Sequence, residues 1–441
     1  MPEAVYRMMT LLCALVWQLP IGTNRGLLHL LWMLTSGRLL ASRGAVFSGL
    51  SASGVSARAT RRAWAALGRG DWTSAQLLGR WAALVAGEGR WQPQTPGGEH
   101  PVAVEVTGFW RPRLRACPTT HFHQEAGQAL PASPVGLVAR VGRVGTQRLA
   151  LPLAFVRADP GDPSPSAHAR RLVGEAVRQC AVADVLVLDA GFGLALLQAA
   201  GAPRYVVRLV KNATFRRATP PAHGGRGRPP TRGTLGRPLP RTYRDQVLPA
   251  TPPDRVATWR EDSLLLRAAV WTDRRRSDAD ADRHPFAVFA SHDPRYRAPL
   301  LLASPLVLPA RAIRDGYADR WPIEQLPLAA KQLRGAARQF VHAPATCQRL
   351  PARTLLAGAV RSYTAATAPA SPAGVLGSPP PADPRTPAAP PHAHALSARL
   401  PRARPHPRKS RRHQPPPHRL LGPARPAGRA GPKSRCGGRL S

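Results

Sequence analysis

Residues 184–189 read DVLVLD, and the uninterrupted apolar run inside this stretch decides the fold class. Consecutive Val and Leu residues leave no polar face, so the strand they predict is buried on both sides. Such a strand belongs in the middle of a sheet that helices cover on both faces. The stretch therefore predicts an α/β fold with a central sheet.

The sequence around this stretch supplies neighbouring elements. Three apolar segments precede it, and we expect each to form a strand: VAVEVTGFW, PVGLVARVG and RLALPLAFVRAD. We expect a helix from Ala167 to Cys180 and one more strand in RYVVRLVKN, which ends at Asn212. Three strands, a helix and further strands define the first part of a core domain, residues 100–212.

A second informative stretch is YADRWPIEQLPLAAK, residues 317–331. At about 100° per residue, four polar side chains of this stretch fall within roughly a 60° sector of one helix, with aliphatic residues opposite. A solvated helix face with ordinary i,i+4 charge pairs is the plainer interpretation. The four residues are Tyr317, Arg320, Glu324 and Lys331.

Prolines interrupt this helix. Pro322 and Pro327 each lack the backbone N–H that a helix needs, so we expect the helix to begin near Trp321 and to kink near Pro327. Tyr317 and Arg320 then lie on the turn that leads into it.

In this stretch, two residues separate the Tyr from the Arg, three separate the Arg from the Glu, and six separate the Glu from the Lys. This spacing resembles the signature of DDE transposases of bacterial insertion sequences, in the insertion-sequence-four family. The resemblance implies a ribonuclease H-like core, whose acidic residues at strand ends and on a late helix converge on two divalent ions, Mg²⁺ or Mn²⁺. Such paired ions lie about 3.5 to 4 Å apart. The implied catalytic and metal-binding residues are Glu105, Asp189 and Glu324.

Two of these carboxylates have alternative interpretations. Asp189 closes the apolar strand just before Gly191 and Gly193, where an Asp is also a common turn former or helix cap. Glu105 stands where the family places an Asp in the first strand. Because Mg²⁺ requires strict octahedral geometry, one added methylene displaces the ligand atom unless the backbone shifts. Glu105 therefore indicates either an adapted metal ligand or a chain that has lost cleavage activity.

The resemblance also implies DNA contacts. Tyr317, Arg320 and Lys331 are expected to hold phosphates around the scissile bond, and Arg208 and Lys211 at the end of the preceding strand suit the same use. The sharper alternative for Tyr317 is a nucleophile that forms a phosphotyrosine, although no cluster of Arg and His on helices accompanies it.

Residues 1–95 are predicted to be helical and to bind DNA. Within them, FSGLSASGVSARATRRAWAAL predicts two short helices around a Ser-Gly turn, as in a helix-turn-helix. The second helix carries Arg58, Arg61 and Arg62. A plain helical bundle with a basic surface is the alternative.

Residues 213–309 form a predicted β-rich insertion. It begins with HGGRGRPPTRGTLGRPLPR, which is either a disordered linker or a loop that clamps a DNA backbone. Three predicted strands follow in LLLRAAVWTD, FAVFASHD and PLLLASPL, and they lead into the signature helix and the end of the core at 310–365. Trp271 and Trp321 are expected either to stack on an unpaired base or to be buried.

Charge and cysteine content restrict the partners and the compartment. The 441 residues carry a formal net charge of +39, which predicts a polyanionic partner and strong salt dependence. The five scattered cysteines indicate reduced thiols. No apolar run is long enough to span a bilayer. We expect a soluble cytoplasmic protein of the bacterial nucleoid, without membrane contact.

Residues 366–441 are rich in Pro and Arg, contain one acidic residue, Asp383, and are predicted to be a disordered basic tail. The tail is either a nonspecific DNA-binding segment or an out-of-frame translation of GC-rich DNA. The second interpretation indicates a chain that is not a fully working copy.

These observations favour a transposase that cuts the ends of its element by metal-dependent phosphodiester hydrolysis and joins the freed 3′-OH to target DNA. Its expected partner is double-stranded DNA, and the joining of two ends implies a homodimer. A relic that binds DNA without cutting it is the first alternative, and a basic RNA-binding protein is the second.

Overall fold

The computed structural model describes residues 3–20, 22–111, 117, 119–123, 125–162, 164–225, 227–278, 284–333, 341 and 343–368. Its helices are α1 (Glu3–Trp17), α2 (Gly26–Thr35), α3 (Arg38–Ala41), α4 (Val46–Ser51), α5 (Ala57–Arg69), α6 (Ser74–Gly87), α7 (Pro165–Gln179), α8 (Leu194–Ala199), α9 (Ala310–Ala318), α10 (Pro322–Leu328) and α11 (Pro344–Thr367). Short 3₁₀ turns span Thr23–Arg25 and Pro96–Gly98, and a π-helical turn spans Ala329–Leu333.

The strands are β1 (Trp91–Pro93), β2 (His100–Trp110), β3 (Thr120–His123), β4 (Gln128–Val144), β5 (Gln147–Arg157), β6 (Asp184–Leu188), β7 (Tyr205–Arg208), β8 (Phe215–Arg217), β9 (Leu235–Gly236), β10 (Arg241–Tyr243), β11 (Gln246–Leu248), β12 (Arg255–Glu261), β13 (Leu264–Arg276), β14 (Phe286–His292) and β15 (Leu300–Ser304). Every strand predicted from the sequence is present, as β2, β4 to β7 and β13 to β15. The helix predicted from Ala167 to Cys180 is α7.

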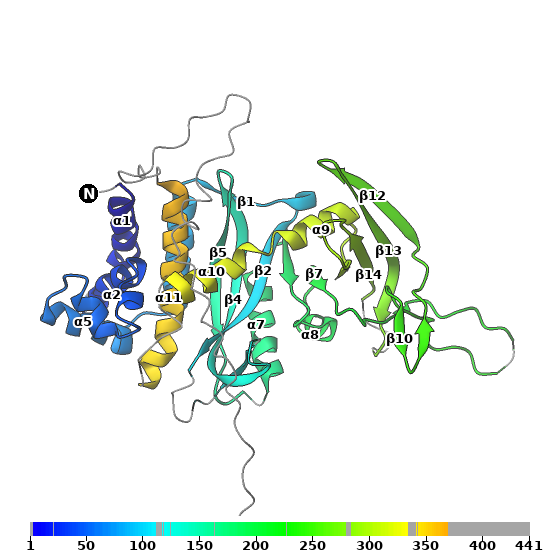
Figure 1. Cartoon of the computed structure of the whole chain (residues 1–441), viewed down its shortest axis with the longest axis horizontal. Coiled ribbons are helices and arrows are strands. Elements are labelled where there is room, and N and C mark those ends of the chain that lie inside the picture. Colours follow the sequence, from blue (N-terminus) through cyan, green and yellow to red (C-terminus); the bar gives the residue numbers. More distant parts are fainter. Residues whose placement is uncertain are drawn as a thin grey trace, which may run out of the picture. The chain divides into compact units, whose positions relative to one another are not determined.

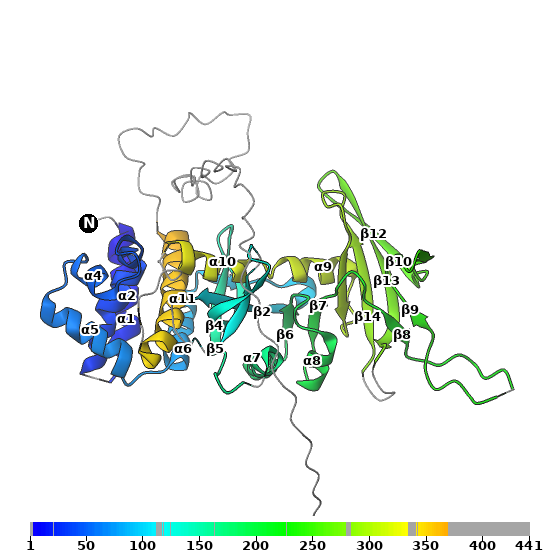
Figure 2. The ribbon, with the colours of Figure 1, turned by 60° about the horizontal axis from the view of Figure 1, so that its bottom comes forward.

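One large mixed sheet contains most of these strands, in the order β1-β4-β2-β6-β7-β15-β14-β13-β8-β9, while β3 and β5 pair with β4 and β12 pairs with β13. The neighbours β2, β6 and β7 run parallel, and the other pairings are antiparallel. Helices α7 and α8 lie on one side of the strands, and α9 and α10 lie on the other (Figures 1 and 2). The α/β prediction is confirmed at this level.

Alternation along the central strands places side chains in separate cores. Val185 of β6 belongs to the apolar cluster that includes residues of α9, whereas Leu186 and Leu188 belong to the cluster beneath α7. All five residues of β6 are buried, as the sequence predicted. Each fully buried Val or Leu stabilises the fold by about 1.5–3 kcal/mol. In β2, Ala103 faces the core shared with the helices of the N-terminal part, and Val102 and Val104 face the opposite side.

The predicted pair of helices near residue 50 is present as α4 and α5. A Cβ atom added to Gly26 of α2 would lie 2.5 Å from the backbone oxygen of Arg62, so only glycine permits the observed approach of α2 to α5. The Ser56 hydroxyl accepts a hydrogen bond from the Ala59 amide and begins α5. This packing leaves Arg58, Arg61 and Arg62 on the exposed face of α5.

The insertion extends the central sheet. Its strand β15 pairs with β7 through Leu302 and Arg208, so the strands that follow lie in the same sheet as β6. Strand β12 was not predicted, although its alternating sequence RVATWRE is typical of a strand with one buried face.

The remaining predictions concern the chain ends and the thiols. The predicted tail overlaps α11 only at its last two residues, and 369–441 lies outside the described residues. Cys13, Cys117, Cys180 and Cys347 form no disulfide in the described part, and Cys436 lies outside it. Among the residues described, no helix combines the length and the apolar character needed to cross a bilayer.

Candidate functional site

Three neighbouring strands carry polar residues in one row. Val104 of β2 is in register with Leu188 of β6, which is in register with Val207 of β7. The next residues along these parallel strands are Glu105, Asp189 and Arg208. The carboxyl ends of parallel strands form the usual ligand-binding edge of an α/β sheet. An Arg208 nitrogen lies 3.6 Å from a carboxylate oxygen of Asp189.

The signature residues reach this edge from a broken helix. We predicted one helical face for Tyr317, Arg320, Glu324 and Lys331, and that prediction is wrong. Tyr317 lies in α9, Arg320 lies between α9 and α10, Glu324 lies in α10, and Lys331 lies in the π-helical turn. As the sequence predicted, α10 begins at Pro322, and a π-helical turn starts two residues after Pro327; Tyr317, which we expected on the turn before this helix, lies in α9.

Arg320 connects two of the predicted carboxylates. Its guanidinium donates one short hydrogen bond to Glu105 and another to Glu324. The arginine side chain is 8% exposed, whereas that of Glu324 is 40% exposed. A buried guanidinium requires carboxylate partners, since an unpaired charge in this position would be costly. Arg320 therefore links Glu105 and Glu324 through one guanidinium.

Tyr317 connects the third carboxylate to the same network. Its hydroxyl donates a hydrogen bond of 3.2 Å to Asp189, and its ring lies under the Arg320 guanidinium at 5.7 Å. Burial and the adjacent Asp189 charge raise the pKa of Tyr317. The phenol therefore stays protonated and acts as a hydrogen-bond donor.

Lys331 binds next to Glu105 on β2. Its ammonium donates a 2.7 Å hydrogen bond to the buried Thr107 hydroxyl and lies 5.5 Å from the centroid of the Phe109 ring. Burial lowers the pKa of Lys331 to about 8, against the opposing effect of Glu105. Thr107 was not predicted as a site residue. The signal available in the sequence is its spacing, since it lies two residues after Glu105 and so shares its face of the strand.

Glu105 has a shifted pKa as well. Burial raises it, although Arg320 acts in the opposite direction, and the charge of Glu324 adds to the increase. The Val106 amide also donates a 3.1 Å hydrogen bond to the Glu105 carboxylate. We refer to Glu105, Thr107, Asp189, Arg208, Tyr317, Arg320, Glu324 and Lys331 together as the strand-end site.

The strand-end site contains oxygen donors of the type that Mg²⁺ and Mn²⁺ prefer. Within the described part of the chain, no group of three or more carboxylate, imidazole or thiol side chains is placed to hold a metal ion. Here the Arg320 guanidinium bonds to both Glu105 and Glu324, and the Tyr317 hydroxyl bonds to Asp189. A metal ion would have to replace at least one of these contacts.

An ion-pair network that we did not predict fixes α9. Arg314 on α9 contacts Asp293, which follows β14, at 3.0 Å and Glu261 of β12 at 2.8 Å. Arg295 also binds Asp293, and its hydrogen bonds together with those of Arg314 lower the pKa of Asp293 to about 2. The network holds the helix that carries Tyr317 against the sheet.

The remaining predicted contacts lie elsewhere. Arg58, Arg61 and Arg62 on α5 have no recorded contact with the strand-end site in the described residues. Lys211 is exposed in the turn after β7. Trp271 is buried and donates to the carbonyl oxygens of Thr251 and Pro252, which rules out stacking on a base in this conformation, whereas Trp321 is 59% exposed.

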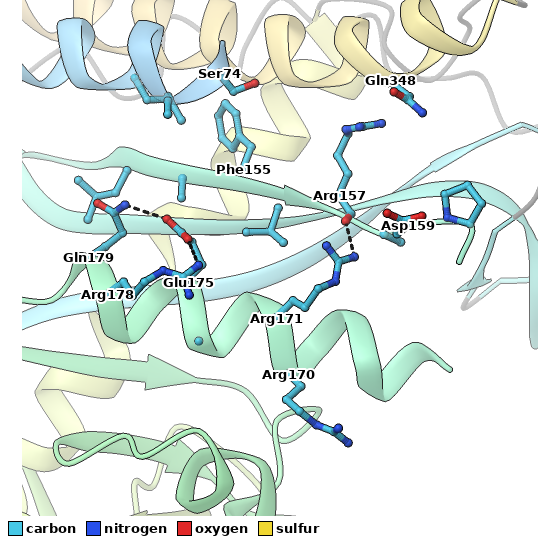
Figure 3. A pocket seen from close by; sticks show the side chains of 18 residues that line it. Ser74, Phe155, Arg157, Asp159, Arg170, Arg171, Glu175, Arg178, Gln179 and Gln348 are labelled. Atoms are coloured by element: carbon cyan, nitrogen blue, oxygen red, sulfur yellow. Dashed lines mark hydrogen bonds and ion pairs between the residues drawn. The ribbon is translucent and has the colours of Figure 1, made fainter. Parts of the chain in front are cut away.

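A separate cleft of about 910 Å³ follows the unpaired edge of β5, between α7 on one side and α6 and α11 on the other (Figure 3). Two of its arginines pair with acids: Arg178 pairs with Glu175, and Arg171 pairs with Asp162 beside the cleft. No residue of the strand-end site lines this cleft.

No protein-family model matches the chain, and no curated protein matches it.

Proposed function

We propose that this protein is a DDE-type transposase of an insertion sequence, which cuts the ends of its element and joins them to target DNA. One observation carries the proposal. Carboxylates from three separate elements, Glu105 on β2, Asp189 after β6 and Glu324 on α10, meet in one polar network at the carboxyl ends of parallel strands. Four polar residues spaced as in a transposase signature contribute to this network.

The order of the central strands supports a ribonuclease H-like core. Three antiparallel strands, β5, β4 and β2, are followed in the sheet by the parallel strands β6 and β7. The carboxylates of β2 and β6 then occupy adjacent positions, and the acidic helix α10 covers them. This arrangement is the one that the signature implies.

Glu105, Asp189 and Glu324 would hold Mg²⁺ or Mn²⁺, which when bound supplies an activated water and stabilises the charge of the leaving oxygen. Arg320 balances the charge of Glu105 and Glu324 before DNA binds. When a phosphodiester approaches, Arg320 can exchange one carboxylate for a phosphate oxygen, because a guanidinium donates hydrogen bonds to either group in a bidentate geometry. Tyr317 orients Asp189 and does not act as a nucleophile.

The cations around the carboxylates bind the DNA backbone. Arg208 is 48% exposed beside Asp189, and Lys331 lies on the other side of Glu105. Together they flank the place where a scissile phosphate must lie to meet the carboxylates. We infer that the exposed arginines of α5 bind DNA of the element ends, and that two copies of the chain bring two ends together.

A second candidate function is favoured by the contacts of Arg320. Its bonds to both Glu105 and Glu324 occupy oxygens that a metal requires, and Glu105 replaces the shorter Asp of the family. A protein fixed in this arrangement binds element ends without cutting them. Glu105→Asp separates this candidate from the first, since the shorter side chain weakens the bond to Arg320.

The test uses a labelled duplex that carries the DNA flanking the coding sequence. The full chain is incubated with it in Mg²⁺ or Mn²⁺, beside Glu324→Gln and the matched control Glu175→Gln, which removes a carboxylate of α7 outside the strand-end site. We expect metal-dependent cuts at the element ends with the natural chain and the control, and none with Glu324→Gln.

Cutting that persists in Glu324→Gln would overturn the assignment of this site. Binding without cutting in the natural chain, with cutting restored by Glu105→Asp, would establish the binding-only candidate. Absence of binding to the flanking DNA would contradict both.

A further inference from the structure

Two arginines of the insertion lie side by side without a carboxylate between them. Arg216 of β8 is directly opposite Arg275 of β13 in the antiparallel register, so both side chains leave the same face of the sheet. Like charges in this position destabilise a sheet. On the other face, Arg217 and Arg274 are also opposite each other, but there Asp254 accepts hydrogen bonds from both. Only one face has its charge compensated.

A pocket of about 630 Å³ lies at this strand pair, and its lining residues, all in the described part of the chain, include arginines of both faces and threonines and no acid. Arg216 bonds only to the carbonyl oxygens of Gly233 and Ser277, which fix its position and leave its charge intact. The Nε atom of Arg275 is buried and has no hydrogen-bond partner. Arg232 on the adjoining loop is exposed and has no ion pair among the described residues.

Carboxylates near this pocket neutralise only part of its charge. Asp254 pairs with Arg217, Asp278 pairs with Arg276, and Asp273 contacts Thr219 at 3.4 Å. Among the described residues, the five lining arginines therefore have three neighbouring aspartates. An orphaned buried donor and excess positive charge indicate an anionic ligand with several oxygens.

A second basic pocket of about 340 Å³ precedes the first along the chain. It is lined by Lys211, Arg237 and Arg241 together with Tyr243, whose ring is half exposed. Arg241 and Arg244 lie 5.4 and 5.3 Å from the centroid of that ring. In the chain only Phe215 separates residues 211–214, which line this pocket, from residues 216–220, which line the first. We name the two together the insertion pockets.

We propose that the insertion pockets hold the phosphodiester backbone of DNA without regard to its sequence, as a second DNA-binding surface distinct from the strand-end site. The proposal rests on the proposed function for the choice of DNA as the polyanion. Consecutive phosphates supply the anionic oxygens that Arg216, Arg275 and Arg232 do not contact among the described residues. Phosphate contacts position a protein on DNA and carry no sequence information.

The test measures binding of the full chain to a labelled duplex of arbitrary sequence, without metal, over a salt series. The variants are Arg216→Gln with Arg275→Gln, and Arg232→Gln alone. The matched control is Arg143→Gln with Arg170→Gln, which removes two exposed arginines outside both pockets. Circular dichroism checks the fold of each variant, and Arg232→Gln lies on an exposed loop where folding is not at issue.

Each lost phosphate contact lowers the slope of log affinity against log salt by about 0.9. For the double variant we expect the slope to change by about 1.8. The ratio of the natural chain's affinity to the variant's affinity should therefore be roughly 60-fold larger at about 0.1 M salt than at about 1 M salt. For Arg232→Gln we expect the slope to change by about 0.9, and for the control pair we expect almost no change in slope. Unchanged slopes in the pocket variants, or an equal change in the control pair, would overturn the proposal.

Titration with tripolyphosphate distinguishes DNA from a small polyanion. If the double variant loses tripolyphosphate binding and keeps the full DNA slope, the pockets belong to a small ligand and the proposal fails. Failure of the proposed function is seen separately, because a chain that never cuts its element ends can still show these salt slopes.

Discussion

The strand-end site and the insertion pockets place arginine in opposite surroundings. Arg320 is buried between two carboxylates that it neutralises, whereas Arg216 and Arg275 lie opposite each other with only backbone carbonyls nearby. The strand-end site is therefore complete in charge and needs an exchange of partners to act. The insertion pockets have surplus charge and are completed by an external anion. In our proposal, the strand-end site is therefore the site of chemistry and the insertion pockets are a surface for binding.

The largest expected effect separates these two roles. Asp189→Asn keeps the shape of the side chain and the hydrogen bond to Tyr317, but it removes a charge that a metal ion requires. We expect cutting to fall on the order of 10²–10³-fold or more, with little change in affinity for DNA of arbitrary sequence. Gel assays measure the expected loss of cutting, and fluorescence anisotropy measures the affinity for DNA, which should change little. The Arg216→Gln, Arg275→Gln variant should show the reverse, and the same profile for both variants would erase the distinction.

The second effect concerns stability. Arg320→Ala leaves Glu105 half-buried without its partner, and loss of one member of a buried pair typically costs about 3–5 kcal/mol. Because both carboxylates retain solvent contact, we expect about 2 kcal/mol of lost unfolding free energy, measured by urea denaturation. Arg320→Lys should recover part of this loss, since it restores the charge without the two-pronged geometry. An unchanged midpoint for Arg320→Ala would show that the network does not hold α10 on the sheet.

The third effect is a pH dependence of the strand-end site. The pKa of Lys331 is about 8, below its ordinary value of 10.5, so its positive charge is lost as pH rises through about 8. We expect affinity for element ends to fall severalfold between about pH 7 and pH 9. Between pH values of about 8 and 10.5, Lys331 is mostly protonated in the unfolded chain but mostly neutral in the folded chain. The unfolded chain therefore binds more protons, and the contribution of Lys331 to the free energy of unfolding increases as pH rises through this interval. Lys331→Arg should abolish the fall in affinity, and a fall of equal size in that variant would assign it to another group.

The smallest effect concerns the stability of the insertion. Arg275→Gln removes the repulsion with Arg216, and a cross-strand pair of like charges costs about 0.2–1 kcal/mol. We expect the variant to unfold at an equal or slightly higher urea concentration when DNA is absent. A clear loss of stability would mean that Arg275 has a structural role, and the contrast with Arg320 would then weaken.

Local patterns predicted the long central strands and the residues at their ends, but not β1, β3 or β8 to β12. The unbroken apolar run of β6 and the alternation in β2 fix which side chains are buried, and hence that Glu105 faces α10 and not α7. The position of Asp189 follows from the end of its strand. These features depend on neighbours in the chain, which a sequence displays directly.

Features that depend on contacts between distant segments were not predicted. The break between α9 and α10 separates Tyr317 from Glu324, yet both still reach the strand-end site because Arg320 lies at the break. The bond from Lys331 to Thr107 and the pairing of Arg216 with Arg275 depend on register between segments far apart in the chain. Periodicity within one segment carries no information about such register.

The most direct test of the central claim, that Glu105, Asp189 and Glu324 act as one metal site, is a calorimetric titration of Mn²⁺ into the full chain bound to its element end. The natural chain should bind Mn²⁺, and Glu105→Gln, Asp189→Asn and Glu324→Gln should each lose that binding while the α7 control Glu175→Gln retains it. Equal Mn²⁺ binding in all five proteins would contradict the claim.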